Sequence, residues 1–274
     1  MKASDVTGSP QHRGRTLGRV GVVKIARFST GSDPRFGIID GDEIVVLEGD
    51  PMFSGFDTTE ERVPISAVRL LAPVIPRSKV IAVEGNYPQN PDDDTDAPPL
   101  FYLKPNTAVV GPGDPVLLPA DAGTIVHEGE LVVVIGRIAK NVSSDDALDH
   151  VFGYTAGNDV TAADLMHEPG QQSRAKGYDT FAPIGPIIET EFDPQNAVIT
   201  TRVAGETRIS GSTAEMKNTV AELVAFVSTV FTLLPGDIIM TGSPAGRGEI
   251  EPGQVVEIGI SGIGTLGNTT RARP

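Results

Sequence analysis

The chain has 274 residues, of which 39% are hydrophobic and 21% are charged, as in an ordinary globular protein. Its 22 basic and 36 acidic residues give a net charge of −14, which argues against nucleic acid and anionic membrane surfaces as partners. The absence of cysteine excludes disulfides, thiolate nucleophiles and Cys-ligated zinc. Because no apolar segment approaches the length of a membrane span or forms a signal-peptide core, we expect a cytoplasmic protein.

The first part of the chain divides into a polar arm and a small β-rich module. Residues 1–17 mix small, polar and charged side chains, which predicts a flexible arm. Residues 18–76 hold short strand-like segments, with a turn at Gly41-Asp42. The predicted strands are Val20–Ile25, Phe36–Ile39 and Glu43–Leu47. A proline-punctuated link around residues 72–77 separates this module from a second domain, residues 77–274.

The second domain begins with the predicted strand Lys79–Val83 and is rich in Pro-Gly and Gly-Asp turns, each followed by a strand-like run. Its buried strand Leu131–Ile135 is apolar and mostly β-branched, and ends at Gly136. The fold class predicted for the whole chain is therefore α+β, with strands predominating.

Helices are few in this domain. One is predicted from a cap at Ser143 or Ser144 to about Val151, with its end at Gly153. Another is predicted over about Thr219–Phe231, where apolar residues recur at helical spacing and indicate one buried face. A third, short helix is predicted from Thr161, because the segment Thr-Ala-Ala-Asp resembles a capping box.

Two glutamates, Glu128 and Glu130, stand one residue apart at the head of the buried strand. Alternate side chains of a strand point the same way, so both carboxylates are expected on one face. Two like charges beside a buried sheet repel each other and lose hydration, and a bound divalent cation would compensate. The alternative is an exposed strand end with two solvated acids.

Asp159 and Lys176 are the next candidates. Asp159 follows a strand that ends in Asn158, and a third carboxylate beside Glu128 and Glu130 would complete an all-oxygen site of the kind that suits Mg²⁺, Mn²⁺ or Ca²⁺. For Asp159 alone, the alternative is helix capping. Lys176, beside a glycine, suits a carboxylate or a developing oxyanion, and its alternative is an ordinary exposed lysine.

The loop Thr241–Gly246 follows the predicted strand Asp237–Met240, where hydroxyls and amides can line a pocket; a plain turn is the alternative. It lacks the spacing of a nucleophile elbow. The segment Gly262–Gly267 matches G-x-G-x-x-G, but too little chain follows for a dinucleotide fold, so it predicts a glycine-rich hairpin. The four histidines, His12, His127, His150 and His167, show no metal-ligand spacing.

As an ordered set, several segments between Lys79 and Thr269 resemble the fumarylacetoacetate hydrolase family. The matching segments are Leu103–Pro105, Gly111–Pro115, Glu128–Leu131, Gly153–Thr155, Asn158–Val160, Lys176–Phe181, Pro183–Pro186, Leu234–Asp237, Thr241–Gly246 and Gly262–Leu266. The small N-terminal module resembles that of bacterial 2-hydroxyhepta-2,4-diene-1,7-dioate isomerase-like members.

This resemblance implies a mixed β-sandwich roll as catalytic domain, a homodimer, and a Mg²⁺ or Mn²⁺ ion held by Glu128, Glu130 and Asp159. It places the family's active-site lysine on Lys176. It implies 2-oxo or β-diketo acid substrates, whose enolate the metal stabilises. The candidate substrate-binding residues are Tyr87, Ala163, Met166, Thr241, Gly242 and Ser243.

The sequence departs from the family at positions that bear on the reaction. Hydrolytic members carry a histidine and a glutamate that activate water, and Asn90 and Asp93 stand at those positions here. An asparagine cannot act as a general base near neutral pH. Ala163 and Met166 replace a family arginine and glutamine that bind a polar substrate end. His167 is nearby and is a candidate proton donor, with a surface histidine as the alternative.

Three functional hypotheses follow. The first is a metal-dependent decarboxylase or keto–enol isomerase, which needs no activated water. The second is an acylpyruvate-type C–C hydrolase in which Asp93, His167 or metal-bound hydroxide replaces the missing base. The third is a metal- and ligand-binding protein without catalysis. The intact carboxylates and Lys176 favour catalysis, and Asn90 favours the first hypothesis over the second.

Overall fold

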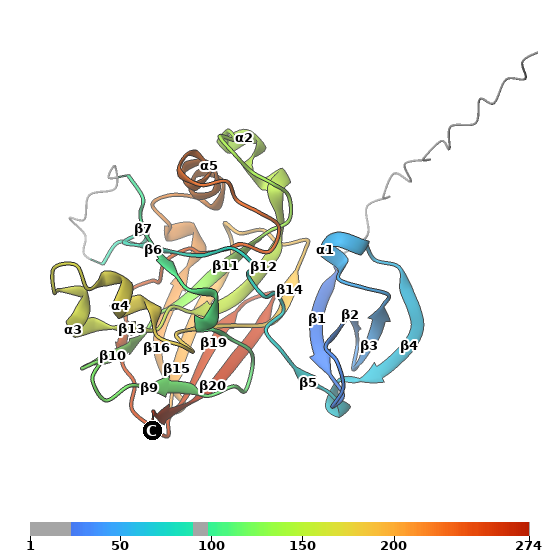
Figure 1. Ribbon diagram of the computed structural model, residues 1–274, viewed down its shortest axis with the longest axis horizontal. Helices are drawn as coiled ribbons and strands as arrows, with labels where there is room; N and C mark the ends of the chain where they lie inside the picture. Colours follow the sequence, from blue (N-terminus) through green and yellow to red (C-terminus); the bar gives the residue numbers. More distant parts are fainter. Residues whose placement is uncertain (1–22, 90–97, 274) are drawn as a thin grey trace, which may run out of the picture.

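The computed structural model describes residues 23–89 and 98–273, which fold into a mostly β structure with a few short helices (Figure 1). The fold class predicted from the sequence, α+β with strands predominating, is confirmed. The described residues form a sheet of twelve strands, a second sheet of five and a small sheet of three. No helix in the described part of the chain is long and apolar enough to cross a membrane.

The N-terminal module, at the right in Figure 1, is an antiparallel meander. Its elements are β1 (Lys24–Ser29), β2 (Arg35–Asp40), β3 (Glu43–Leu47), α1 (Pro51–Ser54), β4 (Thr58–Pro64), a 3₁₀ turn (Ile65–Ala67) and β5 (Arg69–Leu70). The predicted strand Val20–Ile25 is shifted. The strand begins at Lys24 and continues to Ser29, because Ile25, Ala26 and Phe28 supply its buried residues. Positions 20–22 lie outside the described residues.

The twelve-stranded sheet continues from this module into the rest of the molecule, because β1 pairs with β14 (Ala182–Glu189). Next to β14 lie β12 (Val151–Asn158), β11 (Gly129–Ile135), β17 (Ile238–Met240), β6 (Val80–Glu84) and β7 (Leu100–Lys104). The short strand β8 (Val109–Val110) pairs with β14, after a 3₁₀ turn (Asn106–Ala108).

The strand β11 lies at the centre of this arrangement and is buried along its whole length. Leu131, Val133 and Ile135 belong to one hydrophobic cluster and Val132 and Val134 to another, as the alternation of a strand requires. The first cluster also contains the buried face of α5 (Val220–Val230) and residues of the five-stranded sheet. Both faces of β11 are therefore closed to water, and a charged residue at its head lies next to an apolar interior.

The five-stranded sheet follows the order β16 (Glu206–Ser212), β15 (Val198–Val203), β19 (Val255–Ile260), β20 (Gly264–Ala272) and β9 (Val116–Leu118). The hairpin predicted around Gly262–Gly267 is confirmed, since β19 and β20 pair antiparallel from Ile260 and Gly264. The three-stranded sheet joins β13 (Thr161–Ala162), β10 (Ile125–His127) and β18 (Gly248–Glu249).

The helix α5 is the one that the sequence predicts most accurately. Thr219 caps it in a capping box: the Thr219 hydroxyl accepts from the Glu222 N–H, and the Glu222 carboxylate accepts from the Thr219 N–H. The helix expected from Ser143 to about Val151 is shorter than predicted, with α2 (Ser144–Ala147) followed by a 3₁₀ turn (Leu148–His150). Val151 instead starts β12, because the segment that follows it pairs with β11.

The prediction of a capping box at Thr161 is wrong. Thr161 lies in β13, paired with β10, and its hydroxyl donates to the Asp159 carbonyl at 3.0 Å. The helix α3 (Ala163–Met166) starts two residues later, without a side-chain cap. It is followed by α4 (Gln172–Gly177), and a 3₁₀ turn (Thr213–Glu215) precedes α5.

Candidate metal centre

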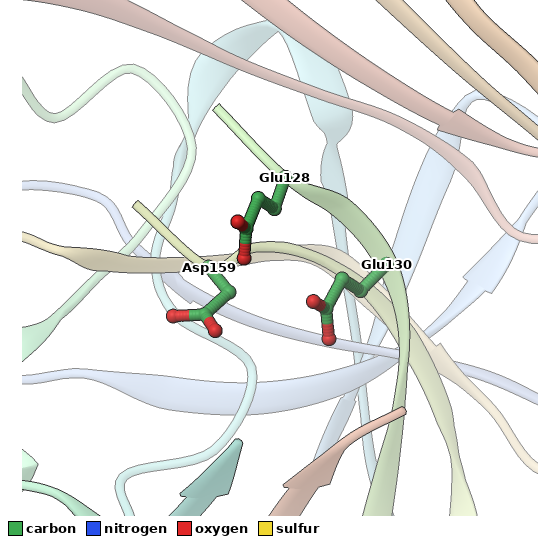
Figure 2. A group of neighbouring side chains, drawn as sticks. All are labelled: Glu128, Glu130 and Asp159. Carbon is green, nitrogen blue, oxygen red and sulfur yellow. The ribbon is translucent and has the colours of Figure 1, made fainter. Parts of the chain in front are cut away.

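Three carboxylates meet where β11 and β12 come together. Glu128 immediately precedes β11, Glu130 is its second residue, and Asp159 immediately follows β12. The pairing of Gly129 with Asn158 puts these strand ends side by side, and the three side chains point toward one another (Figure 2). One oxygen from each lies within 4.8 Å of the others. All three residues are buried, with exposed fractions of 7%, 1% and 1%.

Cationic side chains from three other segments reach this cluster. Lys176, on α4, places its Nζ 2.8 Å from Oε2 of Glu128 and 2.5 Å from Oδ2 of Asp159. Lys104, at the end of β7, pairs with the other oxygen of Asp159 and donates to the Val160 carbonyl. Arg247 reaches Oε1 of Glu128 at 3.1 Å. Glu128 and Asp159 are thereby ion-paired, although neither is exposed to bulk water.

These contacts set the charge states of the group. Burial opposes the charge of Lys176, but Asp159 and Glu128 together outweigh it and raise the lysine pKa. Burial alone would raise the pKa of Asp159, but Lys104 and Lys176 outweigh it and lower that pKa. Lys176 and Asp159 are therefore charged at neutral pH. Burial lowers the pKa of Lys104, although the charge of Asp159 opposes that shift.

Glu130 is the exception. It accepts one bond, from the Gly242 N–H at 2.8 Å, and no ion pair to Glu130 is found among the described residues. Burial, with the negative charges of Asp159 and Glu128, raises its pKa well above the ordinary value. A buried carboxylate in this position lacks a cation. A small hard dication among the three carboxylates would supply it, so these residues fit Mg²⁺ or Mn²⁺.

The loop after β17 is held in place by Asn86. The Asn86 side-chain amide donates to the Thr241 carbonyl at 2.9 Å and to the Asn218 carbonyl at 3.1 Å, and its oxygen accepts from the Asn218 N–H at 2.9 Å. Gly242 has a φ of +93°, and a Cβ there would lie 3.0 Å from the Cβ of Asn86. A glycine is therefore required for the backbone to turn its N–H toward Glu130.

A cavity of about 130 Å³ opens beside the carboxylates. It is lined by Val83, Glu84, Gly85, Gln89, Glu128, Glu130, Ser243, Pro244 and Arg247. Among these lining residues Arg247 is the only cation, and its side chain is 55% exposed. An anionic ligand entering this cavity would meet the guanidinium of Arg247 and two of the three clustered carboxylates, Glu128 and Glu130.

Other residues singled out in the sequence are placed differently. Ser243 lines the cavity, whereas Thr241 is buried and donates its hydroxyl to the Leu131 carbonyl at 2.9 Å. Tyr87 is buried, 1% exposed, and no partner for its hydroxyl is found among the described residues. Burial, followed by the nearby Glu130, raises its pKa.

The remaining candidates lie away from the cavity or outside the described chain. Ala163 and Met166 belong to α3, and the exposed His167 follows it. None of these three is among the described residues that line the cavity. Asn90 and Asp93 lie outside the described residues. The roles suggested for these positions therefore remain predictions.

Sequence reasoning missed three residues that the structure brings to the cluster: Lys104, Asn86 and Arg247. Lys104 lies in the matching segment Leu103–Pro105 and Asn86 directly precedes Tyr87, but neither context shows that the polar residue turns inward. Arg247 follows the loop Thr241–Gly246 directly, so its proximity to that loop was the available signal.

The chain is similar to known proteins over most of its length. Residues 79–271 match the family model described as fumarylacetoacetate (FAA) hydrolase C-terminal, and residues 23–73 match an Rv2993c-like N-terminal model. The chain is 42% identical over 263 residues to protein Rv2993c of Mycobacterium tuberculosis, covering 90% of this chain and 97% of that protein. It is 38% identical over 221 residues to the oxaloacetate tautomerase YisK of Bacillus subtilis, covering 74% and 73%.

Solved structures give the same result. The 2-hydroxyhepta-2,4-diene-1,7-dioate isomerase of Mycobacterium marinum matches with a TM-score of 0.86 and 42% identity, covering 92% of this chain and 99% of that chain. The maleylpyruvate hydrolase of Sphingobium sp. SYK-6, in complex with manganese(II) and pyruvate, matches with a TM-score of 0.76 and 30% identity, covering 92% and 100%. On these matches of sequence and fold, the chain belongs to the fumarylacetoacetate hydrolase family.

Proposed function

We propose that this protein is a divalent-metal-dependent enzyme that acts on a 2-oxo acid through its enolate, with keto–enol tautomerisation as the reaction and decarboxylation as the closely related one. The observation that carries the proposal is the buried cluster of Glu128, Glu130 and Asp159 with the ammonium of Lys176 between two of them. Such a cluster is costly to bury unless it binds a cation that the protein uses.

Glu128, Glu130 and Asp159 would hold Mg²⁺ or Mn²⁺, which acts as a Lewis acid toward the 2-oxo-carboxylate group and favours the enolate. Manganese in the maleylpyruvate hydrolase structure supports this choice of ions. Lys104 and Lys176 fix the orientation of Asp159, and the Gly242 N–H fixes Glu130. These contacts orient the carboxylates before any ligand arrives, which lowers the cost of assembling the site.

Arg247 supports an anionic substrate with a second carboxylate. The protein has a net charge of −14, so a dicarboxylic acid needs a local cation beyond the metal. The guanidinium of Arg247 lies at the cavity with one ion pair, to Glu128, and keeps further donors for a planar carboxylate. A four-carbon 2-oxo dicarboxylic acid such as oxaloacetate therefore fits the proposal, in agreement with the tautomerase name of one relative.

Tautomerisation is favoured over hydrolysis because the sequence has Asn90 where hydrolytic members carry the water-activating histidine. An amide does not accept a proton near neutral pH. Hydrolysis of an acylpyruvate-type C–C bond is the second candidate, and the similarity to the maleylpyruvate hydrolase supports it. The two reactions differ in product, so one set of assays separates them.

The test uses the purified protein loaded with Mn²⁺. Conversion of enol-oxaloacetate to the keto form is followed by ultraviolet absorbance, decarboxylation by pyruvate release, and acylpyruvate cleavage by release of the free acid. We expect tautomerisation above the rate of Mn²⁺ alone, and its loss in Glu130→Gln. Cleavage of acylpyruvates without tautomerisation would establish the second candidate. Metal binding without any of the three activities would point to a non-catalytic protein.

A further inference from the structure

We infer that Glu84 carries the proton in the reaction proposed above. This residue lines the cavity and lies outside the group of carboxylates that could hold the metal. The inference rests on the proposed function and extends it to the transfer of a proton between carbon 3 of the substrate and the protein.

The register of three neighbouring strands places Glu84 opposite the metal cluster. Val132 of β11 pairs with Met240 of β17, and Met240 pairs with Ala82 of β6. Side chains repeat every second residue along a strand, so Glu130 of β11 and Glu84 of β6, each two residues beyond these partners, lie on the same face. Glu130 and Glu84 therefore face the same space from two strands that flank β17.

The cavity of about 130 Å³ is lined by both of these glutamates. Strands in a sheet lie about 4.8 Å apart, so two carboxylate-bearing strands with one strand between them are separated by about 10 Å. The N–H of Gly242, in the loop after β17, donates to Glu130. A small 2-oxo acid therefore has room between Glu130 and Glu84, and the cavity borders both residues.

The position of Glu84 is fixed by Tyr102 on the adjacent strand β7. The Tyr102 hydroxyl is hydrogen-bonded to Glu84, and the phenol pKa is raised to about 12 by burial and then by this carboxylate. The phenol thus stays a neutral donor at physiological pH and holds the Glu84 side chain in place. A carboxylate held by one neutral donor can both accept and return a proton.

Other groups at the cavity are unsuited to this step. Lys176 is ion-paired with Glu128 and Asp159, so its ammonium is held in the charged form. Arg247 does not lose its proton in proteins, and the Ser243 hydroxyl needs a base of its own. Glu128 and Glu130 are committed to the proposed cation site. Among the described residues that line the cavity, this leaves Glu84 as the proton acceptor.

The step is balanced without a co-reactant. Glu84 takes a proton from carbon 3, and the electrons of that C–H bond become the carbon 2–carbon 3 double bond. The π electrons of the ketone move to its oxygen, which the site stabilises as the enolate. Addition of one proton to that oxygen completes the enol, and Glu84 releases its proton to solvent. In the reverse direction, the Glu84 carboxyl group protonates carbon 3, so keto and enol forms differ only in the position of one hydrogen.

The experiment compares Glu84→Gln with the wild type and with Glu61→Gln, an exposed glutamate that is ion-paired with Arg35. Three quantities are measured: ketonisation of enol-oxaloacetate by the Mn²⁺-loaded protein, Mn²⁺ affinity by calorimetry, and affinity of the loaded protein for oxalate. We expect Glu84→Gln to lower kcat by about 100-fold or more, the usual worth of a general base, while both affinities stay within about threefold. Glu61→Gln should match the wild type.

Two further variants secure the interpretation. Glu84→Asp keeps the carboxylate but places it one methylene further from the substrate, so this variant should retain part of the activity. It also tests the role of the carboxylate if Glu84→Gln fails to fold. Tyr102→Phe should lower kcat less than Glu84→Gln does, because it removes only the donor that positions the carboxylate. Equal loss in Glu84→Asp and Glu84→Gln, with metal affinity unchanged, would contradict a role in proton transfer that depends on the carboxylate.

Two results would overturn the inference. Full activity in Glu84→Gln would show that the proton moves through another group. A tenfold or greater loss of Mn²⁺ affinity would show that Glu84 binds the metal. Failure of the proposed function looks different: wild-type protein that binds Mn²⁺ and oxalate would then turn over no 2-oxo acid, whatever residue occupies position 84.

Discussion

The ammonium of Lys176 lies 2.5 Å from Oδ2 of Asp159, and both groups are almost completely buried. Lys176 comes from a short helix and Asp159 from the end of a strand, so this contact fixes α4 against β12. A lone charge at either position would be surrounded by groups that cannot hydrate it. Breaking this ion pair would therefore disturb both the packing of α4 and the charge of the carboxylate cluster.

Replacing Lys176 by methionine should destabilise the metal-free protein by about 3–5 kcal/mol, because Asp159 and Glu128 lose a buried partner. Urea unfolding in EDTA measures this loss. Mn²⁺ should stabilise the variant more than the wild type, since a dication can replace the missing positive charge. Equal stabilisation of both proteins by Mn²⁺ would argue that the ion binds elsewhere.

Glu130→Gln should separate metal binding from stability. Burial raises the pKa of Glu130, which has no ion pair among the described residues, so a neutral amide of the same shape should leave the metal-free protein equally or more stable. In the wild type, Mn²⁺ at 100 times its Kd should add about 2.7 kcal/mol to the free energy of unfolding, and the variant should lose most of that. An unchanged Mn²⁺ titration in Glu130→Gln would remove this residue from the metal site.

Gly242→Ala tests the turn that presents an N–H to Glu130. Gly253 is a matched control, because its φ of +92° is close to the +93° of Gly242 but nothing lies within 4 Å of a Cβ there. Gly253→Ala should cost about 1 kcal/mol from backbone conformation alone. Gly242→Ala should cost more and should also weaken Mn²⁺ binding, because its Cβ meets Asn86. Equal effects of the two substitutions on unfolding and on Mn²⁺ affinity would contradict this role.

Arg247→Gln should discriminate between substrates. If the guanidinium binds the second carboxylate of a dicarboxylic acid, its loss should raise KM for oxaloacetate by about 10- to 100-fold. The affinity for pyruvate, which has no second carboxylate, should change little. Arg62→Gln is the control. Arg62 lies in the N-terminal module, is half-exposed, and is ion-paired with Asp40 and Glu43. Equal losses for both ligands would assign Arg247 to the shared 2-oxo-carboxylate end.

Glu189 gives a pH-dependent prediction away from the metal centre. Burial raises its pKa above the ordinary value, although the backbone N–H of Glu191 donates to it. A carboxyl group with a raised folded-state pKa costs stability at neutral pH, and that cost disappears as the pH falls through the raised pKa. Glu189→Gln should therefore be more stable than the wild type at pH 7, and the two should converge near pH 4. Urea unfolding at both values, with EDTA present, measures the difference; a gain that is independent of pH would contradict this assignment.

Local patterns predicted the parts of the fold in which one segment determines its own structure. The helix α5 follows from an apolar stripe and a capping box, and the pairing of Glu128 and Glu130 on one face follows from strand alternation. Asp159 joins the two glutamates because β12 pairs with β11. The apolar content of both strands indicates that they pair in the interior.

The rest of the site depends on contacts between segments far apart in the chain. Lys104 reaches Asp159 because β7 pairs with β6, and β6 lies beside β17. Lys176 sits on a six-residue helix without a side-chain cap, so nothing local marks α4. Glu84 is one residue after a run of buried strand positions and resembles an ordinary polar strand end. Its relation to Glu130 arises only when three strands are aligned.

The junction between β1 and β14 limits how this protein can diversify. Lys24 and Ile25 complete the hydrogen bonding of Glu189 and Ile188, and both isoleucines are fully enclosed. A shortened relative lacking the first 76 residues would expose this stretch of β14 as an open edge, ready to join another chain's sheet. Loss of the N-terminal module would therefore demand compensating changes along β14.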